Sequence, residues 1–122
     1  MKTRNIACLT VSLVFATLAC STAWGSERNL VDANITRVLI SAGTYGGCMA
    51  AVTVDPSTQL PACGQWWVSF ECQKDNSSDS VIGYRMLDQA QMALALNKKV
   101  LVTISDATIY NGYCVVKRMD IY

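Results

Sequence analysis

The sequence predicts a small, mainly β domain with one α-helix, stapled by disulfide bonds and preceded by a leader. Three observations support this prediction: an apolar run near the N-terminus, short segments rich in Val, Ile and Thr between turn residues, and a single segment with helical periodicity. The chain has 122 residues, including 6 cysteines and no histidine. A domain of this size has a modest core, so we expect covalent cross-links to contribute to its stability.

Residues 1–25 have the pattern of a secretory signal peptide. Lys2 and Arg4 precede an apolar run over residues 6–19, and small residues follow. We therefore expect a single mature domain over residues 26–122, either periplasmic or secreted. The apolar run is too short for a membrane span, and no later segment resembles one.

A lipoprotein is a less favoured alternative for the same leader. Leu18 and Ala19 precede Cys20, which is the order that lipidation needs. However, Thr17 stands where a larger aliphatic residue is usual, so cleavage near residue 25 is the preferred interpretation.

Four cysteines remain after such cleavage: Cys48, Cys63, Cys72 and Cys114. An even number in a short exported chain is typical of disulfides, and four cysteines allow three pairings. We expect Cys48 to bond Cys63 around the proline loop, and Cys72 to bond Cys114. No pair has CxxC spacing and no histidine is present, so we expect no metal site and no cofactor.

Five segments have the composition of β-strands, and one has the periodicity of a helix. The helix is predicted over residues 81–99, where Leu87, Ala90 and Leu94 recur at intervals of three and four. Asn97 is a suitable left-handed residue for its C-terminus. The predicted strands are residues 34–43, 48–55, 65–73, 100–105 and 114–122, the last two joined by an Asn-Gly turn.

The predicted order is three strands, one helix and two strands. A helix between the third and fourth of five strands is the plan of the OB-fold, a five-stranded Greek-key barrel, and this is the fold that we expect. An open two-layer α+β sandwich with the same order is the main alternative.

Two stretches resemble the binding subunits of bacterial A-B toxins, especially those of subtilase cytotoxin and its pertussis-type relatives. They are "DANITRVLISAG", and "MLDQAQMALALNKKVLVTI" in the helix and the strand after it. Cys48 and Cys63 fit the same frame, and the resemblance covers residues 32–105. It implies an OB-fold, a homo-oligomer of five copies, a host glycan as ligand and a catalytic toxin subunit as a further partner.

The resemblance also implies a location for the ligand. The family places a serine of its sialic-acid pocket near the start of the first strand, and Val31 falls at about that position. Asp32, Asn34 and Thr36 are the nearest polar residues. We therefore regard these three as candidate ligand-binding residues.

The adjacent tryptophans of "CGQWWVSFEC" provide a second candidate surface. Side chains alternate along a strand, so the two indoles are expected to face opposite ways. The core set is Trp66, Val68 and Phe70, and the outward set is Trp67, Ser69 and Glu71. The outward set suits stacking on sugar rings or contact with another subunit, unless Trp67 lies beneath the helix or a loop.

The function predicted from these features is that of an exported, non-catalytic binding subunit. The expected helix carries a second apolar side with Met92, Ala95 and Leu96, which suggests contact with other copies. Loss of Lys2 and Arg4 leaves eight basic residues against nine acidic ones, so we expect no nucleic-acid partner. The lack of histidine and of a nucleophile motif argues against an enzyme. A monomeric, disulfide-stapled protein-binding or inhibitor domain is the alternative.

Overall fold

The computed structural model describes residues 25–73 and 78–122. Its elements are β1 (Glu27–Ile40), η1 (Tyr45–Gly47), β2 (Cys48–Val52), η2 (Pro56–Thr58), β3 (Trp67–Ser69), α1 (Ser78–Ala95), β4 (Lys99–Tyr110) and β5 (Tyr113–Ile121). The fold is therefore mainly β with one α-helix between β3 and β4, in the predicted order. The expected leader lies outside the described residues.

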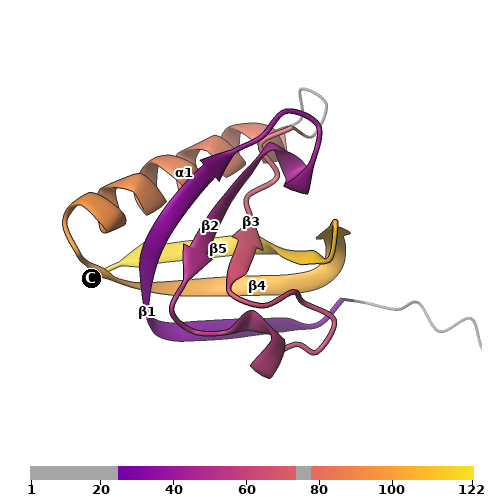
Figure 1. Ribbon diagram of the computed structural model, residues 1–122, viewed down its shortest axis with the longest axis horizontal. Helices are drawn as coiled ribbons and strands as arrows, with labels where there is room; N and C mark the ends of the chain where they lie inside the picture. The colour runs from indigo at the N-terminus through magenta and orange to yellow at the C-terminus, as the bar shows by residue number, and fades with distance from the viewer. Residues whose placement is uncertain (1–24, 74–77) are drawn as a thin grey trace, which may run out of the picture.

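The five strands form one mixed sheet that closes in a ring with the order β1-β2-β3-β5-β4, so the open sandwich is wrong. The β3–β5 pair is parallel, and every other pair is antiparallel. Helix α1 lies on one side of the ring against β1, β2 and β5 (Figure 1). The β4–β5 hairpin turns through Asn111 and Gly112, both at positive φ, which confirms the Asn-Gly turn.

The strand bounds differ most from prediction at β1 and β3. β1 begins seven residues earlier than residue 34 because its first half pairs with β4, a contact that the sequence pattern of either segment does not reveal. The strand bends between its two halves, where the register shifts between Leu30 and Ala33 and Asp32 adopts φ 56°. β3 is only three residues long because Trp66 and Glu71, on either side of it, both have positive φ.

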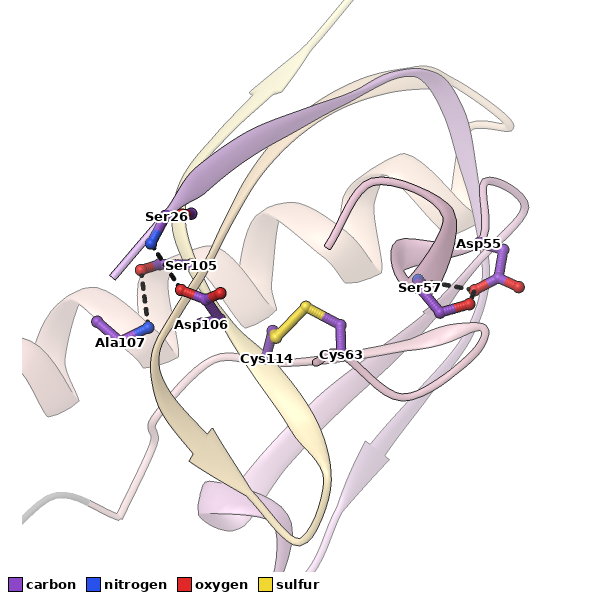
Figure 2. Close-up of a disulfide and its surroundings, with 8 residues drawn as sticks. All are labelled: Ser26, Asp55, Ser57, Cys63, Ser105, Asp106, Ala107 and Cys114. Carbon is purple, nitrogen blue, oxygen red and sulfur yellow. Dashed lines mark hydrogen bonds between the residues drawn. A yellow bond between two sulfur atoms is a disulfide. The ribbon is translucent and has the colours of Figure 1, made fainter. Parts of the chain in front are cut away.

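Each disulfide joins a strand to a loop beside β3, and the expected pairing is wrong. The bonds are Cys48–Cys72 and Cys63–Cys114. Cys48 opens β2 beside the end of β3, because the two strands are antiparallel, so Cys72 is its neighbour. The loop before β3 returns to the start of β5, where the amide of Gly64 donates to the carbonyl of Gly112 over 2.6 Å. Figure 2 shows the Cys63–Cys114 bond at this crossing.

Two disulfides indicate an oxidising, extracytoplasmic compartment. All four cysteines are buried within the hydrophobic core. In the part of the chain that the structure covers, no helix is both long enough and apolar enough to span a membrane.

Helix α1 packs on the ring through a narrow row of small and apolar residues. The buried positions are Gly83, Met86, Leu87, Ala90 and Ala93. A Cβ at Gly83 would overlap the carbonyl oxygen of Phe70, so this glycine permits the helix to lie directly on the backbone after β3.

The end of α1 agrees only in part with prediction. Leu94, expected in the buried row, is exposed, whereas Met92, Ala95 and Leu96 are exposed as expected. Asn97 adopts φ 49°, and the amide of Lys98 donates to the carbonyl of Ala93 over 2.9 Å. These features define a left-handed C-terminal cap and confirm the role predicted for Asn97.

Candidate functional site

The outer face of β1, β2 and β3 carries two rows of side chains that point away from the core. Residues paired across antiparallel strands share a face. The register therefore places Arg37, Ala51 and Trp67 in one row. It places Leu39, Met49 and Ser69 in the next row on the same face. Val38, Ala50 and Val68 form the intervening row, which faces the core.

An open pocket lies on this outer face, and we call it the aromatic pocket. Its lining is Leu39, Tyr45, Met49, Trp67 and Tyr113, and its volume is about 210 Å³. The rings of Tyr45 and Tyr113 meet edge to face, with centroids 5.8 Å apart. Three aromatic side chains from η1, β3 and β5 thus surround a hollow with no charged residue in its lining.

Arg37 extends this surface on the Trp67 side. Its Cζ atom lies 6.0 Å from the centroid of the Trp67 ring, within the range of a cation–π contact. The Arg37 side chain therefore reaches across β2 to the indole. Trp67 is half-buried and faces the outer side, as the alternation argument predicts.

The expectation that Trp66 belongs to the core is wrong, although Val68 and Phe70 are buried as expected. Trp66 is 50% exposed and has φ 63°. Its carbonyl accepts a hydrogen bond from the amide of Val52 over 2.8 Å, just before regular β3 pairing begins. Strict alternation therefore starts at Trp67 and does not extend to its neighbour.

The other two residues of the expected outward set are buried. Ser69 lies under η1, and its hydroxyl donates to the carbonyl of Tyr45 over 2.7 Å. Glu71 is only 5% exposed. One of its carboxylate oxygens accepts from the Tyr110 hydroxyl over 3.2 Å, and the other lies 3.6 Å from the Lys117 ammonium. Ser69 thus anchors η1 at Tyr45, and Glu71 ties the segment after β3 to the β4–β5 hairpin.

A second hollow adjoins the aromatic pocket, and we call it the polar pocket. Tyr45 belongs to both linings and separates the two spaces. The polar pocket has a volume of about 420 Å³ and lies between the turn after β1 and the β4–β5 turn. Its lining is Gly43, Thr44, Tyr45, Gly46, Gln73, Tyr110 and Asn111.

The candidate residues near the start of the chain belong to a different cluster, which we call the Asp32 cluster. The Tyr122 hydroxyl donates to the Asp32 carboxylate over 2.7 Å and accepts from the Asp32 amide over 3.1 Å. The Lys99 ammonium donates to the carbonyl of Asp32 over 3.2 Å and to the side-chain oxygen of Asn34 over 2.6 Å. The hydrogen bond to the Asp32 carboxylate raises the pKa of Tyr122 above its ordinary value.

These contacts give the Asp32 cluster a structural role, because its polar groups bond one another across β1, β4 and the end of β5. Thr36 lies apart from it, and its hydroxyl donates to the carbonyl of Ala51 over 3.4 Å. The six residues predicted to bind ligand are therefore not gathered in one place. Trp67 alone among them lines the aromatic pocket, and ligand binding by the other five stays a prediction.

Sequence reasoning missed Tyr45 and Tyr113, which complete the aromatic pocket. Each is an aromatic residue beside a glycine turn, "TYGG" and "NGY", and this was the available signal. Within residues 25–73 and 78–122, no group of three or more potential metal ligands is found. No protein-family model, curated protein or solved structure matches this chain.

Proposed function

We propose that this chain is an exported, non-catalytic glycan-binding subunit built on an OB-fold barrel. The strand order, the parallel β3–β5 pair and the helix between β3 and β4 support the OB-fold. In that fold the outer face of strands 2 and 3, with the flanking loops, binds oligosaccharides and oligonucleotides. The aromatic pocket occupies this face.

The observation that carries the proposal is the placing of Tyr45, Trp67 and Tyr113 around one open hollow. Aromatic side chains stack on the apolar faces of sugar rings. The Tyr hydroxyl and the Trp N–H can also form hydrogen bonds with a ligand that is partly exposed to water. The lining of the pocket lacks the lysines and arginines that a nucleic-acid backbone requires. A sugar therefore suits it better than an oligonucleotide.

Self-association into a ring, as in the toxin subunits that the sequence resembles, is part of the proposal. Helix α1 and the residue after it expose several large apolar side chains, which contact with another copy would cover. The exposed members are Val81, Ile82, Tyr84, Met92, Leu94 and the adjoining Leu96. Light scattering after size exclusion is expected to show an oligomer at micromolar concentration. A strict monomer would favour the protein-binding or inhibitor alternative.

A glycan array tests ligand binding, with the tryptophan pair supplying matched variants. Trp67→Ala removes the wall of the aromatic pocket, whereas Trp66→Ala removes an exposed indole outside that pocket. We expect the mature protein and Trp66→Ala to label the same glycans, and Trp67→Ala to lose at least about tenfold in apparent affinity. Equal labelling by all three proteins, or labelling of no glycan, would contradict the proposal.

A further inference from the structure

The two adjoining pockets differ in chemistry, and Tyr45 stands between them. The aromatic pocket presents ring faces, Leu39 and Met49. The polar pocket presents side-chain amides, a hydroxyl and glycine backbone. A ligand that fills both must therefore carry an apolar face in one part and hydroxyl or amide groups in the neighbouring part.

Tyr45 is held as a fixed wall between the two spaces. Its φ of 58° lies in the left-handed region, which a non-glycine residue adopts only when its surroundings hold it there. The Ser69 hydroxyl binds its carbonyl from below, and its ring contacts the edge of Tyr113. The division of the cleft is thus present before any ligand arrives.

The polar pocket contains hydrogen-bonding groups that make no bond to the part of the chain described by the structure. The side-chain oxygen of Gln73 accepts from the amide of Gly43 over 2.8 Å, which orients the rest of its amide group. Among the described residues, neither the Gln73 side-chain nitrogen nor the Asn111 side chain has a hydrogen-bond partner. The Gln73 nitrogen can donate to a ligand hydroxyl, and the Asn111 side chain can both donate and accept.

The charged residues near the two pockets indicate whether the ligand is charged. Of the residues that the structure describes, none in the lining of either pocket is charged. The nearby Glu71 carboxylate is buried and paired with Lys117 and Tyr110, so it does not face a ligand. The guanidinium of Arg37 lies over Trp67, outside both linings. The cleft therefore suits an uncharged ligand better than an acidic one.

We propose that the ligand is an uncharged oligosaccharide of at least two rings that crosses Tyr45. One ring stacks among Tyr45, Trp67 and Tyr113, and the hydroxyls of the next ring bond the amides of Gln73 and Asn111. This inference rests on the proposed glycan-binding function and adds the length and the charge of the ligand. It also assigns a specificity role to Gln73 and Asn111.

The test uses an array that prints mono-, di- and trisaccharides of galactose, glucose, mannose and their N-acetylated forms on one linker. Sialylated and sulfated counterparts are printed beside them. Uncharged di- or trisaccharides are expected to bind about tenfold more tightly than their component monosaccharides, since the second ring adds hydrogen bonds. Adding a charged group to the same glycan is expected not to strengthen binding.

Three variants separate the two pockets. Gln73→Met removes the side-chain nitrogen of Gln73 together with its bond to Gly43, and Asn111→Gly removes the Asn111 amide. Glycine fits the positive φ of Asn111. Both variants are expected to fold and to lose the preference for longer glycans. Tyr45→Gly removes the wall while suiting its left-handed backbone, and it is expected to lose the same preference. Tyr45→Phe keeps the ring and is the control. Circular dichroism confirms folding in each case.

The outcomes distinguish this inference from the function on which it rests. Monosaccharides that bind as tightly as their extended forms, or binding restricted to charged glycans, would overturn the two-ring inference and leave glycan binding intact. The two-ring inference would also be overturned if all three variants still bound di- and trisaccharides more tightly than monosaccharides. Absence of binding to every printed glycan would reject the proposed function itself.

Discussion

The aromatic pocket and the Asp32 cluster use polar and aromatic residues in opposite ways. In the Asp32 cluster, Tyr122 bonds Asp32, and Lys99 bonds both Asn34 and the Asp32 carbonyl. In the aromatic pocket, by contrast, the rings of Trp67 and Tyr113 line an open hollow. The comparison indicates that one region holds the strands together and the other remains available to a ligand.

The two pockets and the Asp32 cluster also differ in backbone conformation. Four residues with positive φ line one or both of the two pockets. They are Gly43, Tyr45, Gly46 and Asn111. In the Asp32 cluster only Asp32 has this conformation, at the bend of β1. The pocket walls are therefore shaped by turns that the disulfides anchor to the sheet.

The largest expected effect is the loss of the disulfide beside Tyr113. The joint change Cys63→Ser and Cys114→Ser opens a loop with a sequence separation of 51. The chain-entropy model predicts a fall of about 4 kcal/mol in the free energy of unfolding. Chemical denaturation followed by circular dichroism measures it. An unchanged midpoint would contradict the role of this bond.

The second disulfide provides a comparison within the same fold. The changes Cys48→Ser and Cys72→Ser open a shorter loop, with a separation of 24, and are expected to cost about 3.5 kcal/mol. If the double variant at Cys63 and Cys114 still folds, it is also expected to bind glycans more weakly, because Tyr113 loses its covalent anchor. Equal binding by both variants would contradict this link to the pocket.

A smaller loss of stability is expected from Gly83→Ala on α1. The added methyl group would overlap the Phe70 carbonyl, so the helix must move away from the end of β3, at a cost of about 1–3 kcal/mol. Gln91→Ala, on the exposed side of the same helix, is the control and is expected to change stability by less than about 0.5 kcal/mol. Thermal unfolding compares the two variants. Equal midpoints would show that α1 does not lie so close to the sheet.

The sequence was informative where local chemistry decides the structure. The Asn111 turn, the Asn97 cap, the helix position between β3 and β4, and the involvement of the four cysteines in disulfides all follow from residue type and short-range pattern. The pairing of the cysteines did not, because it depends on which strands become neighbours in the closed ring. Only the three-dimensional order brings Cys63 beside Cys114.

The candidate site was also predictable only in part, because it depends on which segments become neighbours in the fold. Alternation placed Trp67 on the outer face, but it failed at Trp66, where the backbone turns left-handed before the strand begins. Tyr45 and Tyr113 reach Trp67 from segments far apart in the chain, so no local pattern links them. The family resemblance made Asp32 a candidate ligand-binding residue. The sequence alone could not show that Asp32 forms hydrogen bonds with Tyr122.

The smallest expected effect concerns Tyr122 in the Asp32 cluster. Because its pKa is raised in the folded state, the neutral phenol is favoured there, and this stabilisation is complete below the ordinary tyrosine pKa. It is lost as the pH rises through the raised value. Tyr122→Phe is therefore expected to lower stability slightly at neutral pH and to remove that alkaline dependence, without weakening glycan binding. Denaturation at a series of pH values checks this, with Tyr84→Phe as an exposed control.

The central claim is that ligand binds at the aromatic pocket and not at the Asp32 cluster. The most direct test is nuclear magnetic resonance of the isotope-labelled protein, titrated with the uncharged disaccharide that gives the strongest array signal. The amide signals of Tyr45, Trp67 and Tyr113 are expected to shift in a saturable way. Shifts confined to Asp32, Asn34 and Tyr122 would contradict the claim.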